Sequence, residues 1–152
     1  MALPLFFEDI LPAFAVEGVV NLMEGADPEN TAWEKLPQAT VIRQGNEAAV
    51  LIKWKQDGEL CHVLNGYWEI DVLFEQMGRR EELYHPREKV AFVQKPGFEN
   101  FAKLRINTVA MGPGIYDGVV RLLFKNPDGI AIPIAAFGEL GMIEIYRAGF
   151  PK

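Results

Sequence analysis

The segment Tyr67–Glu75 alternates strictly between side chains that suit a protein core and side chains that suit its surface. Its apolar positions are Trp68, Ile70, Val72 and Phe74. A helix would spread these four side chains around its circumference, whereas a β-strand points all of them to one side. We therefore predict a strand here that faces a hydrophobic core, with Trp68 near the centre of that core.

Shorter alternating segments recur along the rest of the chain, near residues 50–54, 89–93, 104–108, 116–124, 130–134 and 142–147. Turn signals separate several of them, such as Asp57-Gly58 and Asn126-Pro127-Asp128-Gly129. Residues 78–88 are polar and are expected to form a loop, and Gly138–Gly141 is expected to break the strand pattern before residues 142–147. The pattern contains no amphipathic stretch long enough for a substantial helix. It predicts an all-β fold, an antiparallel β-sandwich of seven to nine strands.

The length of 152 residues fits a single domain. Within residues 1–152 we expect residues 1–23 to be an N-terminal arm or first strand. Residues 24–39 are rich in Pro, Gly and Asp and are expected to form a loop with at most one helical turn. Residues 40–147 are then the body of the sandwich.

Two stretches resemble immunoglobulin-like and fibronectin-type domains over about residues 40–147. One is Trp68-x-Ile70-x-Val72, and the other is Pro113-Gly114-Ile115-Tyr116, which is similar to a tyrosine corner. The resemblance implies an immunoglobulin-like sandwich in which the Tyr116 phenol bonds to backbone a few residues upstream. The alternative for Tyr116 is a core aromatic beside a turn. Since Cys61 is the single cysteine, the antibody-type disulfide is absent and only the wider architecture is implied. The chain is also similar to small bacterial β-sandwich proteins with no assigned activity.

The charge balance argues against polyanionic partners. The net charge is −6, and apart from Arg79-Arg80 the basic residues are scattered. A nucleic-acid or anionic-membrane surface needs a basic stripe, so we expect neither partner. The N-terminus carries acids where a signal peptide would carry basic residues, and no apolar run reaches about 20 residues. The expected location is cytoplasmic.

Several catalytic chemistries are excluded or disfavoured by residue types. The chain has no serine, which rules out a serine hydrolase, and none of its three threonines is N-terminal. Cys61 adjoins His62, but neighbouring residues of a strand point to opposite faces, so a structural cysteine is expected. The positions of the two histidines and the one cysteine do not match the spacing of metal ligands in known zinc motifs. We expect neither a metal nor a cofactor.

Carboxylates are the remaining candidates for catalysis. Glu69, Asp71 and Glu75 share the polar face of one strand, with Glu69 and Asp71 about 7 Å apart by strand geometry. That separation suits an inverting glycosidase, which makes a carboxylate-based hydrolase one alternative function. The simpler interpretation is ion pairing across the sheet with Arg121 and Lys125. We favour the ion pairs and expect no enzymatic activity.

The outward face of the predicted sheet is unusually apolar. Its expected apolar residues are Tyr67, Leu73, Ile115, Val119, Leu123 and Pro133. Exposed apolar patches of this kind mark interfaces. We therefore expect a protein-interaction or self-association module, with another protein or a second copy in a homodimer as partner, unless residues 1–23 pack over the face.

A second alternative function is a carbohydrate-binding sandwich. It would need exposed coplanar aromatic side chains, and the candidates Trp33, Tyr67, Tyr84 and Tyr146 lie on dispersed segments. The sequence identifies no small-molecule ligand.

Overall fold

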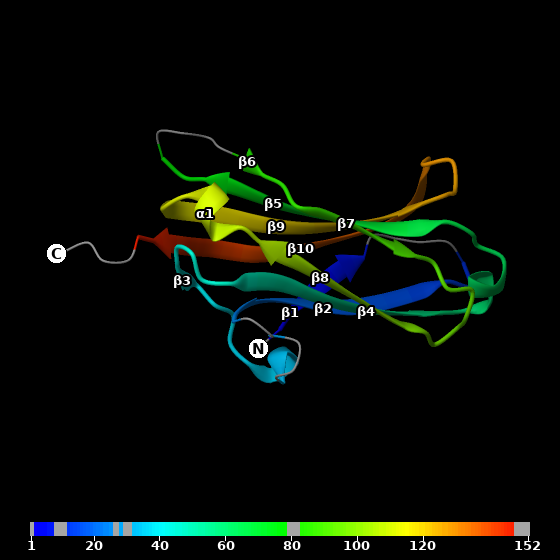
Figure 1. The fold of residues 1–152 in the computed structure, drawn as a ribbon. Coiled ribbons are helices and arrows are strands. Elements are labelled where there is room, and N and C mark those ends of the chain that lie inside the picture. The colour runs from blue at the N-terminus through cyan, green and yellow to red at the C-terminus, as the bar shows by residue number, and fades with distance from the viewer. Residues whose placement is uncertain (1, 8–11, 26–27, 29–31, 79–82, 148–152) are drawn as a thin grey trace.

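The alternating segments form one curled sheet that is nearly closed into a barrel (Figure 1). This is a computed structural model, described for residues 2–7, 12–25, 28, 32–78 and 83–147. The strands are β1 (Leu3–Phe7), β2 (Ala15–Glu24), β3 (Val41–Arg43), β4 (Ala48–Asp57), β5 (Tyr67–Gln76), β6 (Leu83–Tyr84), β7 (Arg87–Ala91), β8 (Glu99–Ile106), β9 (Gly114–Lys125) and β10 (Ala131–Tyr146). The helical elements are η2 (Trp33–Lys35), η3 (Glu59–His62) and α1 (Thr108–Met111). No helix among the described residues has the length and apolar character to cross a membrane.

The sheet folds over into two layers that face each other. The strand order is β6-β5-β9-β10-β1-β2-β4-β8, with β7 added on β5 and the short β3 pairing parallel to β10. In Figure 1 the strands β5, β9 and β10 lie above β2 and β4. All the other pairings are antiparallel, as the sequence predicts.

Strand β1 joins the two layers along one side. Its residues 3–5 pair with β2, and its residues 6 and 7 pair with β10. A Cβ atom on Gly138 of β10 would lie 2.9 Å from Leu5 Cδ2, so glycine permits this close approach. On the opposite side β7 and β8 lie near each other without pairing, which leaves the barrel incompletely closed.

The all-β prediction is confirmed, but its immunoglobulin-like form is not. A sandwich of that type has two separate sheets, whereas here β1 pairs with both layers. Residues 1–23, expected as an N-terminal arm or first strand, supply β1 and most of β2 to the sheet. Residues 8–11 lie outside the described part.

Trp68 fills the middle of the core, as its strand pattern predicts. It is fully buried, and its ring lies 5.8 Å from that of Trp54 and 5.1 Å from that of Phe124, both edge-on. Phe14 and Phe92 complete this aromatic cluster. Because the cluster draws on β4, β5 and β9, it binds the two layers together.

Tyr116 makes the backbone contact that a tyrosine corner implies. Its hydroxyl donates to the carbonyl oxygens of Met111 and Gly112, the latter at 3.0 Å. The ring is 1% exposed, so this bond also satisfies a buried polar group. The contact anchors the start of β9 to the turn after α1.

Three local expectations are wrong. The segment Gly138–Gly141 does not break the strand, since β10 runs through it with a register irregularity between Glu139 and Gly141. Residues 78–88, expected as loop, contain β6 and the start of β7. Cys61 lies in the 3-10 turn η3 and not in a strand.

In the described part of the loop after β2, residues 33–35 form the 3-10 turn η2, which packs on the outer side of β2 and β4. Trp33 contacts Ala49 and Leu51 in a second, smaller hydrophobic cluster. The amide of Asn21, fully buried on β2, donates to the carbonyl oxygens of Trp33 and Leu36 at 2.8 and 2.9 Å. This one polar residue therefore fixes the loop against the sheet.

Candidate interaction site on the outer face

The outer face of β5, β9 and β10 carries the apolar residues that the sequence places there. Leu73 lies opposite Val119, and Leu123 lies opposite Ala135 in the next strand. Leu73, Val119 and Leu123 are half-buried, and all three point away from the core because their neighbours along each strand are buried. The structure thus brings the central part of the predicted set together.

The remaining predicted residues lie toward the margins of this face. Tyr67 begins β5, Pro133 lies where the β9–β10 register is irregular, and Ile115 is opposite Glu144. Ile115 is 46% exposed and Pro133 is also exposed. They share the face with the central residues.

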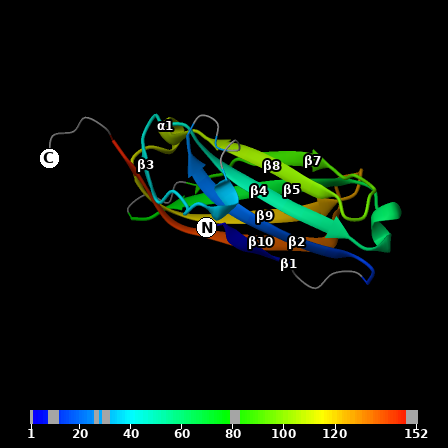
Figure 2. The ribbon, with the colours of Figure 1, turned by 90° about the horizontal axis from the view of Figure 1, so that it is seen from below.

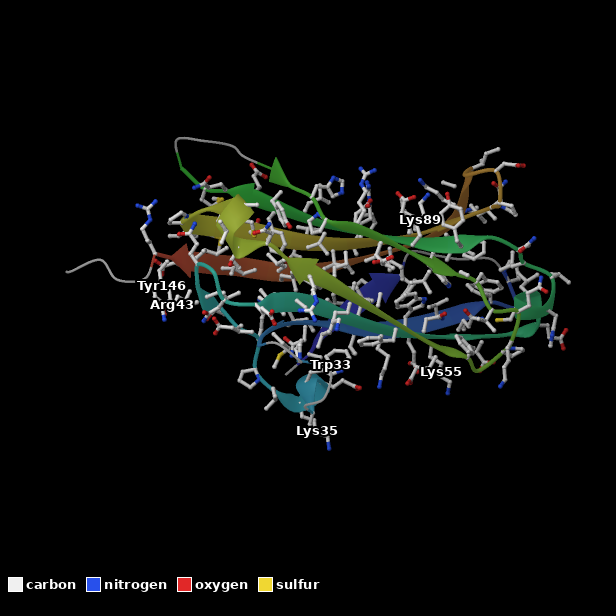
Figure 3. All side chains as sticks on the ribbon, in the orientation of Figure 1. Trp33, Lys35, Arg43, Lys55, Lys89 and Tyr146 are labelled. Atoms are coloured by element: carbon white, nitrogen blue, oxygen red, sulfur yellow. The ribbon has the colours of Figure 1, made fainter. Side chains whose placement is uncertain are left out.

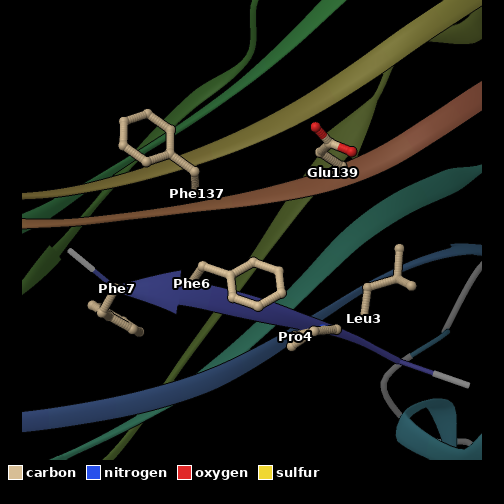
Figure 4. Close-up of a pocket in the computed structure, with 6 residues that line it drawn as sticks. All are labelled: Leu3, Pro4, Phe6, Phe7, Phe137 and Glu139. Carbon is tan, nitrogen blue, oxygen red and sulfur yellow. The ribbon is translucent and has the colours of Figure 1, made fainter.

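A shallow apolar groove continues the face onto β1 (Figure 4). It has a volume of about 620 Å³ and is lined by Leu3, Pro4, Phe6, Phe7, Phe137 and Glu139. Phe6 lies directly opposite Phe137, and these side chains are 69% and 40% exposed. We call the set Phe6, Leu73, Val119, Leu123, Ala135 and Phe137 the apolar outer patch.

The prediction missed Phe6 and Phe137 for an identifiable reason. Ile134, Ala136, Gly138 and Leu140 are all buried, so the period of two continues past Ile134 and places Phe137 outward. The two glycines at 138 and 141 conceal this continuation in the sequence, because glycine is depleted from strands. Phe6 joins the patch through the long-range pairing between β1 and β10, which has no signal in the local sequence.

The N-terminal segment does not cover the apolar outer patch. Residues 3–7 and 15–24 extend the sheet sideways, and Phe6 itself belongs to the patch. Within the described part of the chain, this contradicts the alternative in which residues 1–23 pack over the face.

A buried ion-pair cluster lies within the same face, between the Leu73–Val119 pair and Leu123. Asp71 is fully buried and lies opposite Arg121 on β9 and Arg87 on β7. Arg121 donates through Nε to Asp71 Oδ2 at 3.1 Å and through Nη2 to the same oxygen. Arg87 Nε and His85 Nε2 lie 3.2 and 3.5 Å from Oδ1, off the line of a hydrogen bond. Two cations therefore hold one carboxylate in the sheet.

The second carboxylate is paired in the same way. Lys125 Nζ lies 2.8 Å from Glu69 Oε2, and this hydrogen bond raises the pKa of Lys125. The cross-strand ion pairs that the sequence favours are thus confirmed. A hollow of about 480 Å³ includes Glu69 and Lys125 but not Asp71, so the two carboxylates do not line one cleft.

Cys61 and His62 are neighbours in the chain but differ in burial. The thiol is fully buried and its pKa is raised by desolvation, whereas His62 is exposed. The other histidine, His85, lies against Asp71. Among the described residues no group of three His, Cys, Asp or Glu side chains could hold a metal ion.

The aromatic residues considered for carbohydrate binding are dispersed. In Figure 3, Trp33 lies below the lower layer and Tyr146 lies at one end of the upper layer. Trp33 is 6% exposed and packs in its own cluster. Tyr84 packs against Phe74 and its hydroxyl accepts from the Asn107 amide.

A scan against protein-family models and a search of curated proteins found no match. Among solved structures, the chain aligns with "pT26-6p" over 96% of its own length and 25% of that chain, with 14% identity and a TM-score of 0.46. The chain thus spans about a quarter of the length of that neighbour.

Proposed function

We propose that this chain is a non-catalytic interaction module that binds a protein through the apolar outer patch. The observation that carries the proposal is the exposed pair Phe6 and Phe137 beside the groove of about 620 Å³. Antiparallel sheets with a solvated face usually alternate apolar and polar residues, and contiguous exposed apolar surface marks contact sites. A protein partner would remove these rings from water.

A charged side chain within the patch fits the same interpretation. Arg121 lies between Val119 and Leu123 on β9, opposite Phe137, and is held by Asp71, so its charge is fixed within the patch. Arginine is enriched among the energetically important residues of protein interfaces. Since each carboxylate already has a cationic partner, Glu69 and Asp71 have a structural role in this proposal.

Two variants test the patch against a matched control. Phe137→Glu and Leu123→Glu place a charge within it, whereas Val63→Glu alters a residue that is 69% exposed in the β4–β5 connection. Light scattering measures whether the 17.1 kDa chain associates with a second copy of itself. Affinity capture with each purified variant as bait measures whether it binds a different protein. We expect the two patch variants to lose binding and the control to retain it.

Two observations together would contradict the proposal. The protein would stay monomeric at high concentration, and wild type, Phe137→Glu and Leu123→Glu would capture the same partners. Thermal unfolding of each variant shows that its fold is intact before binding is compared.

A further inference from the structure

The groove that continues the apolar outer patch has a carboxylate in its wall. Glu139 lines this groove together with Phe6 and Phe137, and its side chain is exposed. More exposed carboxylates follow toward the end of the sheet where β3 lies beside β10 (Figure 2). We call the whole set the acidic end: Glu75, Asp117, Glu139 and Glu144. The apolar groove and the acidic end therefore form one continuous surface.

The strand register places these carboxylates close to the patch and to one another. Glu139 lies opposite Val119, and Leu73 lies opposite Val119 on its other side. In the next outward row of the sheet, Asp117 lies directly opposite Glu75. Like charges directly opposite each other on neighbouring strands are destabilising. A cation bound between these two carboxylates would relieve that repulsion.

The chain itself does not neutralise the acidic end. Among the described residues, none of its carboxylates forms an ion pair or a side-chain hydrogen bond. Arg121 lies on the same face, but its guanidinium is bound to Asp71. Arg43 on β3 is exposed at the margin of the face, opposite Tyr146, and forms no ion pair within the described part of the chain. The acidic end therefore keeps its negative charge.

A partner that covers the apolar outer patch also covers Glu139, because this residue follows Phe137 by two positions on the same face of β10. Removing a carboxylate from water is costly unless a cation or a hydrogen-bond donor binds it. We propose that the partner is a basic protein segment, in which lysine or arginine adjoins apolar side chains. This inference rests on the proposed function and specifies the chemistry of its partner.

The groove indicates how such a segment would bind. An apolar side chain would lie against Phe6 and Phe137, and a cation beside it would reach Glu139 in the wall of the groove. A second cation would lie between Asp117 and Glu75. Arginine also stacks on aromatic rings, which favours it next to Phe137.

A second copy of the chain fits this chemistry poorly. The net charge of the chain is −6, and the cations at the other end of the face already have acidic neighbours. Lys125 Nζ lies 2.8 Å from Glu69 Oε2, and Arg87 Nε lies 3.2 Å from Asp71 Oδ1. A second copy would have to break these pairs to supply a cation. The negative charge also repels nucleic acid and anionic membranes, so a basic protein is the occupant that fits.

Peptide binding to the full chain, measured by fluorescence anisotropy, tests the chemistry of the partner. The probes are three labelled peptides in which phenylalanine alternates with lysine, with glutamine or with glutamate. We expect the lysine peptide to bind at least about tenfold more tightly than the glutamine peptide, and the glutamate peptide to bind most weakly. The affinity for the lysine peptide is expected to fall as salt is added, because salt screens the charges.

Two double variants with equal net charge separate the acidic end from the charge of the whole chain. Asp117→Asn with Glu139→Gln is expected to bring the lysine peptide to within about threefold of the glutamine peptide. Glu17→Gln with Asp128→Asn removes two exposed carboxylates elsewhere and is expected to retain the preference for lysine. Thermal unfolding shows that each variant is folded before binding is compared.

The outcomes separate this inference from the proposed function. If the three peptides bind equally and Phe137→Ala weakens each of them, the patch binds apolar segments and the basic partner is wrong. The basic partner is also wrong if no peptide binds, or if both double variants lose the same amount of affinity. A dimer that Phe137→Glu dissociates would identify a second copy as the occupant and overturn this inference alone. Binding of the lysine peptide that Phe137→Ala leaves unchanged would overturn both proposals.

Discussion

Removing Arg121 while keeping Asp71 is expected to destabilise the fold strongly. The Asp71 carboxylate is fully buried, and both hydrogen bonds to its Oδ2 come from Arg121. Deleting one partner of a buried ion pair costs about 3–5 kcal/mol, because the other charge is left without compensation. Arg87 remains near Oδ1, and the Arg121 side chain is 34% exposed, so we expect the lower end, about 3 kcal/mol, for Arg121→Met.

Urea unfolding followed by tryptophan fluorescence measures this cost. A loss of about 3 kcal/mol corresponds to a fall of about 9 °C in Tm for a chain of this size. Asp71→Leu combined with Arg121→Met replaces the pair by apolar side chains and is expected to recover to within about 1 kcal/mol of wild type. The reasoning is refuted if Arg121→Met costs less than about 1 kcal/mol, or if the double variant is no more stable than Arg121→Met.

Four further predictions concern the core. Trp68→Ala removes the centre of the aromatic cluster and is expected to cost about 3–5 kcal/mol in chemical unfolding, whereas a loss below about 1 kcal/mol contradicts its central role. Tyr116→Phe removes the bonds to Met111 and Gly112 and is expected to cost about 1–2 kcal/mol in the same assay, and an unchanged midpoint argues against an anchoring role. Cys61 is expected to react with a thiol reagent far more slowly in the folded than in the unfolded protein, and equal rates contradict its burial. Because burial raises the pKa of this thiol, the unfolded chain ionises first, so stability is expected to fall as the pH rises past the ordinary value of 9.0.

The sequence predicts the local features of this fold well. In β5 the period of two identifies both the core-facing residues and the outward ones, because side-chain direction in a strand depends only on position. The same rule places Leu73, Val119 and Leu123 on one face, and cross-strand charge pairing predicts the partners of Glu69 and Asp71.

The features that the sequence did not reveal depend on long-range pairing. Whether the two layers are separate sheets or one curled sheet depends on β1, whose five residues pair both with the next strand, β2, and with β10 at the other end of the chain. Glycine is unusual within strands, so Gly138 predicts a break at this point. Its actual role is to let β10 approach Leu5 and Val20, a contact with no local signature.

Photo-cross-linking from position 137 tests the proposed interaction surface most directly. A photoreactive phenylalanine analogue replaces Phe137, and a second protein carries it at Val63 as the control, since both side chains are exposed. After irradiation in cells that normally make the protein, we expect discrete protein adducts from position 137 and none from position 63. The absence of adducts at position 137, in a protein whose fold is intact, would contradict the account.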